Sequence, residues 1–485
     1  MDKGFRSLFL VLVFALVIFS DRGAIGGDGV PRWNALQALM DEGRLTAERF
    51  TLLQPLLAAP LYVAGDLWFR WSTRLGPGSP AYQEGRLERI RKVVQRFNKL
   101  IVFLIVLWYF LAMRRIFGLG EREAAAASVF LLFGSMLLPQ SKDFYSECLW
   151  TLTSVLPLSY LSGRGGGEDL PWDFKTLVAF VLPISASVLL NPVLGVAFAA
   201  VALCAALPAG GRRKGISPLA RAGKPLARWL LLGGGAVALG ALLSLGENFL
   251  RRGNPLDFGY APAGFAHLGW FSAPLLAGLA GQLFSPARGI LFFVPAFFLG
   301  IWLWLRPGGL SEEARRFVLL SLAYSVALLF VYSKWFAWHG AGGWGPRFLL
   351  PLSVFGAVYL ALWVKTSWRS AGAPARAALA LVGAMSVVGY HIGASVNDIH
   401  LKECFLRAPD IEACFWESGN FLFASLVRPD DLKIMLTHRS SLVLASGVLL
   451  FSLLMRFVPS GVSQSHGADR GEGSSPSAHP GSGGL

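Results

Sequence analysis

Apolar runs of about 17 to 20 residues recur along the whole chain, and short polar segments separate them. A helix needs about 20 such residues to cross the hydrocarbon core of a bilayer. The pattern predicts about twelve spanning helices, near 5–20, 98–113, 124–139, 145–161, 174–190, 193–207, 229–246, 289–305, 315–333, 348–364, 377–396 and 439–457. We therefore expect an all-α, polytopic membrane protein.

Composition supports this fold class. The 485 residues are 54% hydrophobic and 15% charged, which is too little charged surface for a soluble domain. The net charge of +15 comes largely from Lys and Arg in short loops, above all in the 208–228 loop, which is the pattern of cytoplasmic loops rather than of a nucleic-acid-binding face. We predict a transmembrane domain over 1–458 and a disordered cytoplasmic tail over the Gly- and Ser-rich 459–485.

With the N-terminus inside and the first helix uncleaved, the basic loops all fall on the cytoplasmic side. The predicted outer segments are then 21–97, 140–144, 247–288, 334–347 and 397–438. The first contains an apolar stretch, Leu52 to Trp71, interrupted by Pro55 and Pro60. A span there would move the basic loops outside, so we interpret 50–71 as an interfacial or re-entrant element.

A carboxylate stands out in the first outer segment. Asp28 lies in Gly26-Gly27-Asp28-Gly29-Val30-Pro31-Arg32-Trp33-Asn34, directly after the first apolar run. Glycine and proline make this a loop ahead of an amphipathic run. Asp28 is therefore a candidate catalytic base; the alternative is an ordinary Asp in a Gly-rich turn.

Other polar side chains gather at the predicted outer ends of the spans. Asp143 and Glu147, in Lys142-Asp143-Phe144-Tyr145-Ser146-Glu147, are four residues apart and share a helical face if the helix has begun there. Further along come Ser285-Pro286-Ala287-Arg288-Gly289 and the segment from Lys334 to Phe348, with Trp335, Trp338, His339, Trp344 and Arg347. Ionisable groups at a membrane edge are costly and often functional.

Taken in order, these motifs resemble the GT-C class of integral membrane glycosyltransferases. The similarity is greatest to bacterial protein mannosyltransferases and aminoarabinose transferases, and it extends over most of residues 1–365. The resemblance implies transfer of a sugar from a polyprenyl-phosphate donor to a lipid, glycan or protein acceptor at the outer face. It also implies a bacterial inner membrane with the active site on the periplasmic side, and membrane lipids rather than nucleic acid as surroundings.

In that class an acidic residue of the first outer loop acts as general base, and Asp28 is the residue that matches it. Lys142, Arg288 and Arg347 are the candidate cations for the donor phosphate, and Asp143 and Glu147 are candidates for binding acceptor or metal. Trp335, Trp338, His339 and Trp344 could line a sugar or lipid groove, or form an aromatic belt. No second acidic residue adjoins Asp28, so the requirement for a divalent cation stays open.

Two other functions share these features. A transporter or flippase of a lipid-linked saccharide would place polar groups near the bilayer midplane, whereas here they crowd the outer ends. A non-catalytic scaffold of the same fold would be indifferent to Asp28→Asn. Cys404 and Cys414 lie in one outer segment, where a disulfide is plausible in an oxidising compartment.

Overall fold

The computed structural model describes residues 3–20, 25–74, 76, 79–164, 171, 173–206, 218–260, 269–306, 308–340, 343–396, 399–407 and 411–456. Its regular elements are helices, with no strand among the residues described. The all-α prediction is confirmed. The predicted tail, 459–485, lies outside the described residues.

Every apolar run that was predicted to span is helical. In chain order these helices are α1 (Lys3–Phe19), α5 (Phe97–Arg115), α6 (Glu121–Phe133), α8 (Glu147–Ser162), α10 (Leu182–Leu190), α11 (Leu194–Ala206), α12 (Pro218–Arg252), α15 (Leu299–Leu305), α16 (Glu312–Lys334), α17 (Leu350–Ser367), α18 (Ala373–Ser395) and α22 (Arg439–Arg456). Short pieces complete three of them: α7 (Leu137–Gln140) follows α6, α9 (Phe174–Thr176) and the π-helix η1 (Leu177–Val181) precede α10, and α14 (Ile290–Phe293) and η2 (Pro295–Phe298) precede α15. Pro183 stands where the π-helix η1 passes into α10, and Pro295 opens η2, because proline lacks an amide hydrogen for the helical ladder.

By length and apolar composition, five of the described helices could cross a membrane, or six if a bent pair forms one span. The five are Pro80–Arg115, Leu230–Arg252, Glu312–Lys334, Arg347–Ser367 and Ala373–Ser395. Five further apolar helices are shorter, at 10 to 17 residues. The protein is therefore helical and membrane-like in composition, while the figure of about twelve spans remains a prediction.

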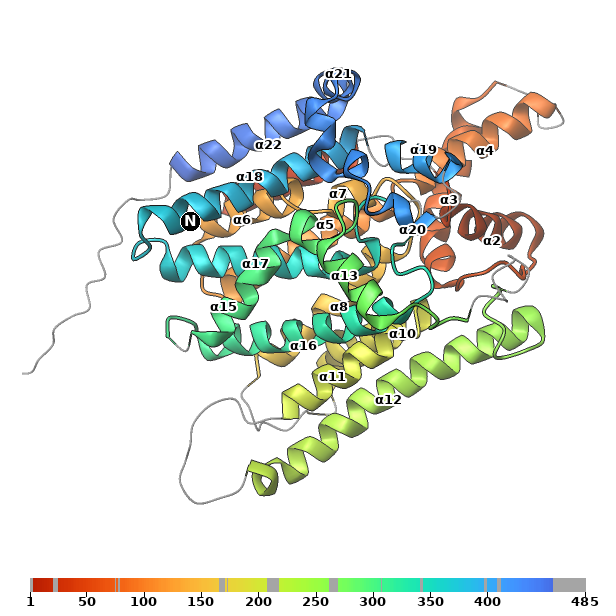
Figure 1. Ribbon diagram of the computed structural model, residues 1–485. Coiled ribbons are helices and arrows are strands. Elements are labelled where there is room, and N and C mark those ends of the chain that lie inside the picture. Colours follow the sequence, from red (N-terminus) through yellow and green to blue (C-terminus); the bar gives the residue numbers. More distant parts are fainter. Residues whose placement is uncertain are drawn as a thin grey trace, which may run out of the picture.

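The helices form one elongated bundle with a distinct group at one end (Figure 1). The N-terminus of α1 and the turn between α17 and α18 lie towards the opposite end (Figure 1). The end group consists of α2 (Gly29–Glu42), α3 (Leu53–Ser72) and α4 (Pro80–Val94), and α13 (Leu275–Phe284), α19 (Ile399–Arg407), α20 (Ile411–Cys414) and α21 (Pro429–Thr437) complete the fold. The predicted outer segments thus carry helices of their own at the end of the bundle where α2 begins.

Polar side chains inside the bundle pair with one another through hydroxyl groups. Ser154 Oγ and Tyr324 OH are 2.6 Å apart, and Ser321 Oγ and Tyr359 OH are 2.7 Å apart. Buried polar groups are tolerated when they are hydrogen-bonded. These uncharged hydroxyl pairs therefore link α8 to α16 and α16 to α17. The charged side chains that shape the site lie at the helix ends instead.

Candidate active site

Asp28 occupies the N-cap position of α2, just after a turn that only glycine can make. Gly27 has a φ of 49°, and the amide of Gly29 donates to the Gly26 carbonyl at 2.8 Å. A Cβ added at Gly27 would lie 2.4 Å from the hydroxyl oxygen of Tyr145. Both the backbone conformation and the contact therefore require glycine at position 27, and they fix the Asp28 loop against the segment that leads into α8.

The Asp28 carboxylate lies in a cluster that joins four separate parts of the chain. Its Oδ2 is 2.7 Å from Nη2 of Arg347, and its Oδ1 is 2.8 Å from Nη2 of Arg49. Nη1 of Arg347 lies 3.4 Å from Oε1 of Glu147 at the start of α8. Of the candidates named from sequence, the structure thus brings Asp28, Glu147 and Arg347 together, with Arg347 between the two carboxylates.

The Gly-rich run ahead of α17 holds Arg347 in place. Arg347 begins the short 3-10 helix η3 (Arg347–Leu349), and its guanidinium lies 5.0 Å from the centre of the Tyr145 ring. A Cβ at Gly343 would meet Cδ of Arg347 at 2.7 Å, and one at Gly340 would meet its Cγ at 3.0 Å. Side chains at these positions would displace the arginine, so both glycines belong to the site.

Arg32, one helical turn after Asp28, fastens this loop to the entry of α8. It donates to the carbonyl oxygen of Asp28 at 2.7 Å and to Ser146 Oγ at 2.9 Å, and it is 5% exposed. Its guanidinium also lies 3.9 Å from the centre of the Phe50 ring. Phe50 has a φ of 76°, the one positive value for a non-glycine residue among those described. Strain of this kind persists only where surrounding contacts over-determine it.

The surrounding arginines set the protonation of Asp28. Burial raises the pKa of this carboxyl, but the charges of Arg347, Arg32 and Arg49 outweigh burial and lower its pKa below the ordinary value. Asp28 is therefore ionised at neutral pH. With Arg347 and Arg49 in place, each of its oxygens accepts a hydrogen bond from a guanidinium. Two guanidinium groups therefore stabilise its ionised form.

The cluster does not fit a divalent cation in this arrangement. A metal ion bridging Asp28 and Glu147 would need the position that the guanidinium of Arg347 occupies between them. The carboxylates therefore already have a counter-charge from the chain itself. Asp143, the other acidic candidate, lies in the turn before α8 rather than on it, because the helix begins at Glu147. The proposed shared helical face of Asp143 and Glu147 is thus wrong.

The two other cations predicted to bind phosphate are directed at backbone carbonyls. Lys142 Nζ donates to the carbonyls of Gly393 and Ala394 at the end of α18. Arg288 is 2% exposed and donates to the Gly345 carbonyl at 3.2 Å. Neither is among the charges that lower the pKa of Asp28. Arg288 supports the loop that presents Arg347, while a phosphate-binding role for either residue stays a prediction.

The aromatic candidates divide into two groups. Trp338 and Trp344 are buried in the protein, at 5% and 7% exposure, so an aromatic belt does not describe them. His339 stacks on Phe415 with 4.2 Å between ring centres. Burial, with the charges of Arg288 and Arg347, lowers the pKa of His339 to about 3, so its ring is neutral at pH 7.

Trp335 is linked to the charged cluster through two other aromatic rings. Its ring centre is 6.2 Å from that of Tyr260, which in turn lies 6.3 Å from Phe50. Burial raises the pKa of Tyr260, and the charge of Asp28 raises it further. These rings therefore form an apolar wall that ends at Arg49 and Asp28.

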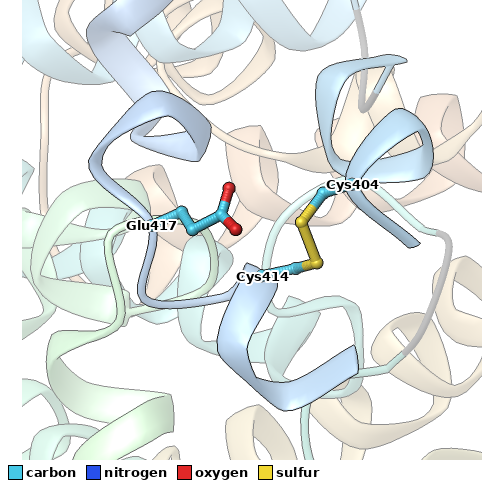
Figure 2. A group of neighbouring side chains, drawn as sticks. All are labelled: Cys404, Cys414 and Glu417. Carbon is cyan, nitrogen blue, oxygen red and sulfur yellow. A yellow bond between two sulfur atoms is a disulfide. The ribbon is translucent and has the colours of Figure 1, made fainter. Parts of the chain in front are cut away.

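Cys404 and Cys414, whose pairing the sequence left open, form a disulfide, with Cα atoms 5.9 Å apart. Figure 2 shows the bridge beside Glu417. Among the residues described, Cys404, Cys414 and Glu417 form a group of potential metal ligands, with their ligand atoms within 4.8 Å of one another. Because both thiols are consumed by the bridge, they offer no thiolate to a metal. The bridge joins α19 to α20 and holds Phe415 against His339.

Removing the disulfide between Cys404 and Cys414 should destabilise the folded protein. Closing a loop of ten residues contributes about 2 to 3 kcal/mol to stability through the unfolded chain. We expect the double variant Cys404→Ser/Cys414→Ser to melt several degrees lower in detergent than the parent. Cys204→Ser, outside the bridge, is the control. Equal melting temperatures for parent and double variant would contradict a stabilising role.

Sequence reasoning missed three members of the site. Arg32 is four residues from Asp28 at the start of an amphipathic helix, which is a spacing that could have pointed to it. Arg49 and Tyr260 lie in irregular segments and carry no periodic signal. Only the fold shows that 49 and 260 approach residue 28 from two other parts of the chain.

Comparison with known proteins gives a single fold-level likeness to report. No protein-family model and no curated protein matches the chain. Among solved structures, the chain is similar to that of ArnT from Cupriavidus metallidurans bound to undecaprenyl phosphate. The identity is 14%, the TM-score is 0.44, and the match covers 92% of this chain and 78% of that one. ArnT is a GT-C glycosyltransferase, the class that the motifs resemble. A likeness this distant carries no conclusion about activity, which depends on the site itself.

Proposed function

We propose that the protein is a membrane glycosyltransferase that moves a sugar from a polyprenyl-phosphate donor to an acceptor hydroxyl, with Asp28 as general base. The observation that carries the proposal is the pairing of Asp28 with Arg347. Arg347 is buried and pairs with Asp28 and with Glu147 at the start of α8. Arg49 also pairs with Asp28, and Arg32 lies beside it. A base and a phosphate-binding cation thus lie within one hydrogen bond of each other.

The arginine pairing suggests how the donor prepares the base. A phosphate carries more charge and more acceptor oxygens than a carboxylate, and arginine binds it through two parallel N–H groups. When the donor phosphate binds Arg347, it competes with Oδ2 of Asp28 for the same N–H group. Asp28 then loses part of the positive charge that stabilises its ionised form. Burial raises its pKa as a result, towards the value of a useful base. Donor binding therefore activates Asp28.

The transfer step balances as a single displacement. The acceptor oxygen attacks the anomeric carbon, its proton passes to Asp28, and the bond from that carbon to the phosphate oxygen breaks. The polyprenyl phosphate leaves with the electron pair, and Arg347 stabilises the charge that develops on it. One displacement with one base inverts the anomeric configuration, unlike double displacement with two carboxylates. We place this step at the periplasmic face of a bacterial inner membrane, where the predicted outer segments lie.

A transporter of a lipid-linked saccharide is the second candidate. It needs polar or ionisable groups along a path through the bilayer, often at broken helices. The π-helical turn η1 ahead of α10 and the turn at Asn191 are the features that favour it. However, Asn191 donates to Tyr332 OH at 2.7 Å, and the interior hydroxyls of Ser154 and Ser321 are also paired with tyrosines. The charged cluster at one end of the bundle favours chemistry over transport.

Mass spectrometry of glycolipids, glycans and glycoproteins tests the proposal in cells. Cells that carry the gene should contain a sugar-modified species that is absent without it and absent with Asp28→Asn. A transporter would give a species that survives Asp28→Asn. Identical profiles with and without the gene would contradict any transferase.

The pH dependence should differ between the free protein and the donor complex. In the free protein Arg347, Arg32 and Arg49 lower the pKa of Asp28, so the base form persists to low pH and is lost only below that pKa. In the complex the phosphate holds Arg347, so the pKa is higher. We expect the acid limb of kcat to lie at higher pH than the acid limb of kcat/KM, because the two report the complex and the free enzyme. Coincident limbs would contradict donor-driven activation.

A further inference from the structure

A groove of about 940 Å³ opens beside the candidate base, on the outer side of α2. Its lining includes Asn34 and Gln37 of α2, Thr46, Glu48 and Arg49 of the segment that follows, and Gly259. Ligand pockets are usually about 300 to 1,000 Å³, so the volume suits a saccharide of more than one residue. The second hollow, near Arg288, measures about 40 Å³ and is too small for a sugar. We call the first hollow the α2 groove.

Arg49 connects the α2 groove to Asp28. It lines the groove and at the same time lies 2.8 Å from Oδ1 of Asp28, the oxygen that Arg347 does not contact. The two sides of the carboxylate therefore differ. Oδ2 faces the arginine proposed to bind the donor phosphate, and Oδ1 faces the groove wall. A hydroxyl that enters from the groove and displaces Arg49 meets the base directly.

The chemistry of the groove wall indicates what it binds. Its residues offer amide, carboxylate, hydroxyl and guanidinium groups, and no aromatic or large aliphatic side chain is among those that line it. Such a wall can donate to and accept from many hydroxyls. Its apolar members, Pro31, Ala38 and Ala47, are small and give a lipid chain or an apolar peptide little to pack against.

We infer that the α2 groove is the acceptor site, and that the acceptor is a polyhydroxylated saccharide rather than a lipid tail or a protein segment. This inference rests on the proposed transferase function and adds the substrate class. The donor reaches Asp28 by displacing Arg347, and the acceptor reaches it by displacing Arg49. Each substrate therefore removes one arginine from the same carboxylate.

Filling the groove tests the inference. Gln37→Trp places a large side chain on the half-buried groove wall, and Gln83→Trp places the same side chain on the exposed part of α4, outside the groove. We expect Gln37→Trp to lower the sugar-modified product in cells at least tenfold and Gln83→Trp to leave it unchanged. Both purified variants should bind undecaprenyl phosphate as the parent does, which shows that the fold and the donor side are intact.

The outcomes separate the inference from the proposed function. If Gln37→Trp makes as much product as the parent while Asp28→Asn makes none, the transferase stands and the groove assignment is overturned. If the modified species is a peptide or a lipid without a saccharide acceptor, the acceptor class is overturned. If the parent itself makes no product, both fail. A saccharide product lost in Gln37→Trp but kept in Gln83→Trp supports the inference.

Discussion

Asp28→Asn should reduce sugar transfer by about 10²- to 10⁴-fold, the range that positioned acid–base catalysis contributes. Asparagine keeps the shape of the side chain and can still accept hydrogen bonds from Arg347 and Arg49, but it cannot take up the acceptor proton. The loss should therefore appear in kcat. A single-turnover assay with purified protein and a labelled polyprenyl-phosphate sugar measures it.

The control for Asp28→Asn is a second carboxylate of the same helix. Asp41 accepts a hydrogen bond from Tyr62 OH at 2.7 Å and pairs with Arg86 at 2.9 Å, away from Asp28. Asp41→Asn also removes a charge from an arginine pair, but we expect it to leave the transfer rate unchanged. Equal rates for the parent and Asp28→Asn would remove Asp28 from the reaction.

Arg347→Ala should have the second largest effect, on binding and on stability together. Loss of charge-assisted hydrogen bonds to the phosphate should weaken polyprenyl-phosphate affinity by about 10- to 100-fold. The variant also removes the guanidinium between Asp28 and Glu147, and loss of one partner of a buried ion pair costs about 3 kcal/mol, less where Arg49 still pairs with Asp28. Titration with undecaprenyl phosphate and thermal melting in detergent measure the two effects.

Two further variants separate binding from stability. Arg347→Lys keeps the charge but loses the paired N–H groups, so it should recover much of the stability and only part of the affinity. Arg316 is a buried arginine near the N-terminus of α16, and it donates to the Arg164 and Ala205 carbonyls. Arg316→Ala should lower the melting temperature and leave phosphate affinity unchanged. Unchanged affinity in Arg347→Ala would place the phosphate elsewhere.

The helices could be predicted because apolar runs are local signals. All twelve predicted segments are helical, since each run is long enough to favour one helix. Whether each of them spans is a different question. The irregular geometry before Pro295 shortens one of the segments, and composition alone does not decide how a membrane accommodates it.

The site was predictable only in part, for a physical reason. Asp28, Glu147 and Arg347 could be chosen because each is an isolated ionisable residue beside an apolar run, where charge is costly. Arg49 and Tyr260 lie in polar, irregular segments where such residues are unremarkable. Their roles depend on tertiary contacts: Arg49 reaches Asp28 from 21 residues away, and Tyr260 comes from a segment beyond α12. Hydrophobic periodicity contains no information about those contacts.

The most direct test of the account is the affinity of the purified protein for undecaprenyl phosphate, with and without the Asp28 charge. If phosphate and Asp28 compete for Arg347, Asp28→Asn binds the lipid phosphate at least as tightly as the parent does, although it transfers no sugar. Weaker binding by Asp28→Asn would show that the carboxylate holds the arginines in place for the phosphate instead of competing with it, which would contradict the proposed coupling.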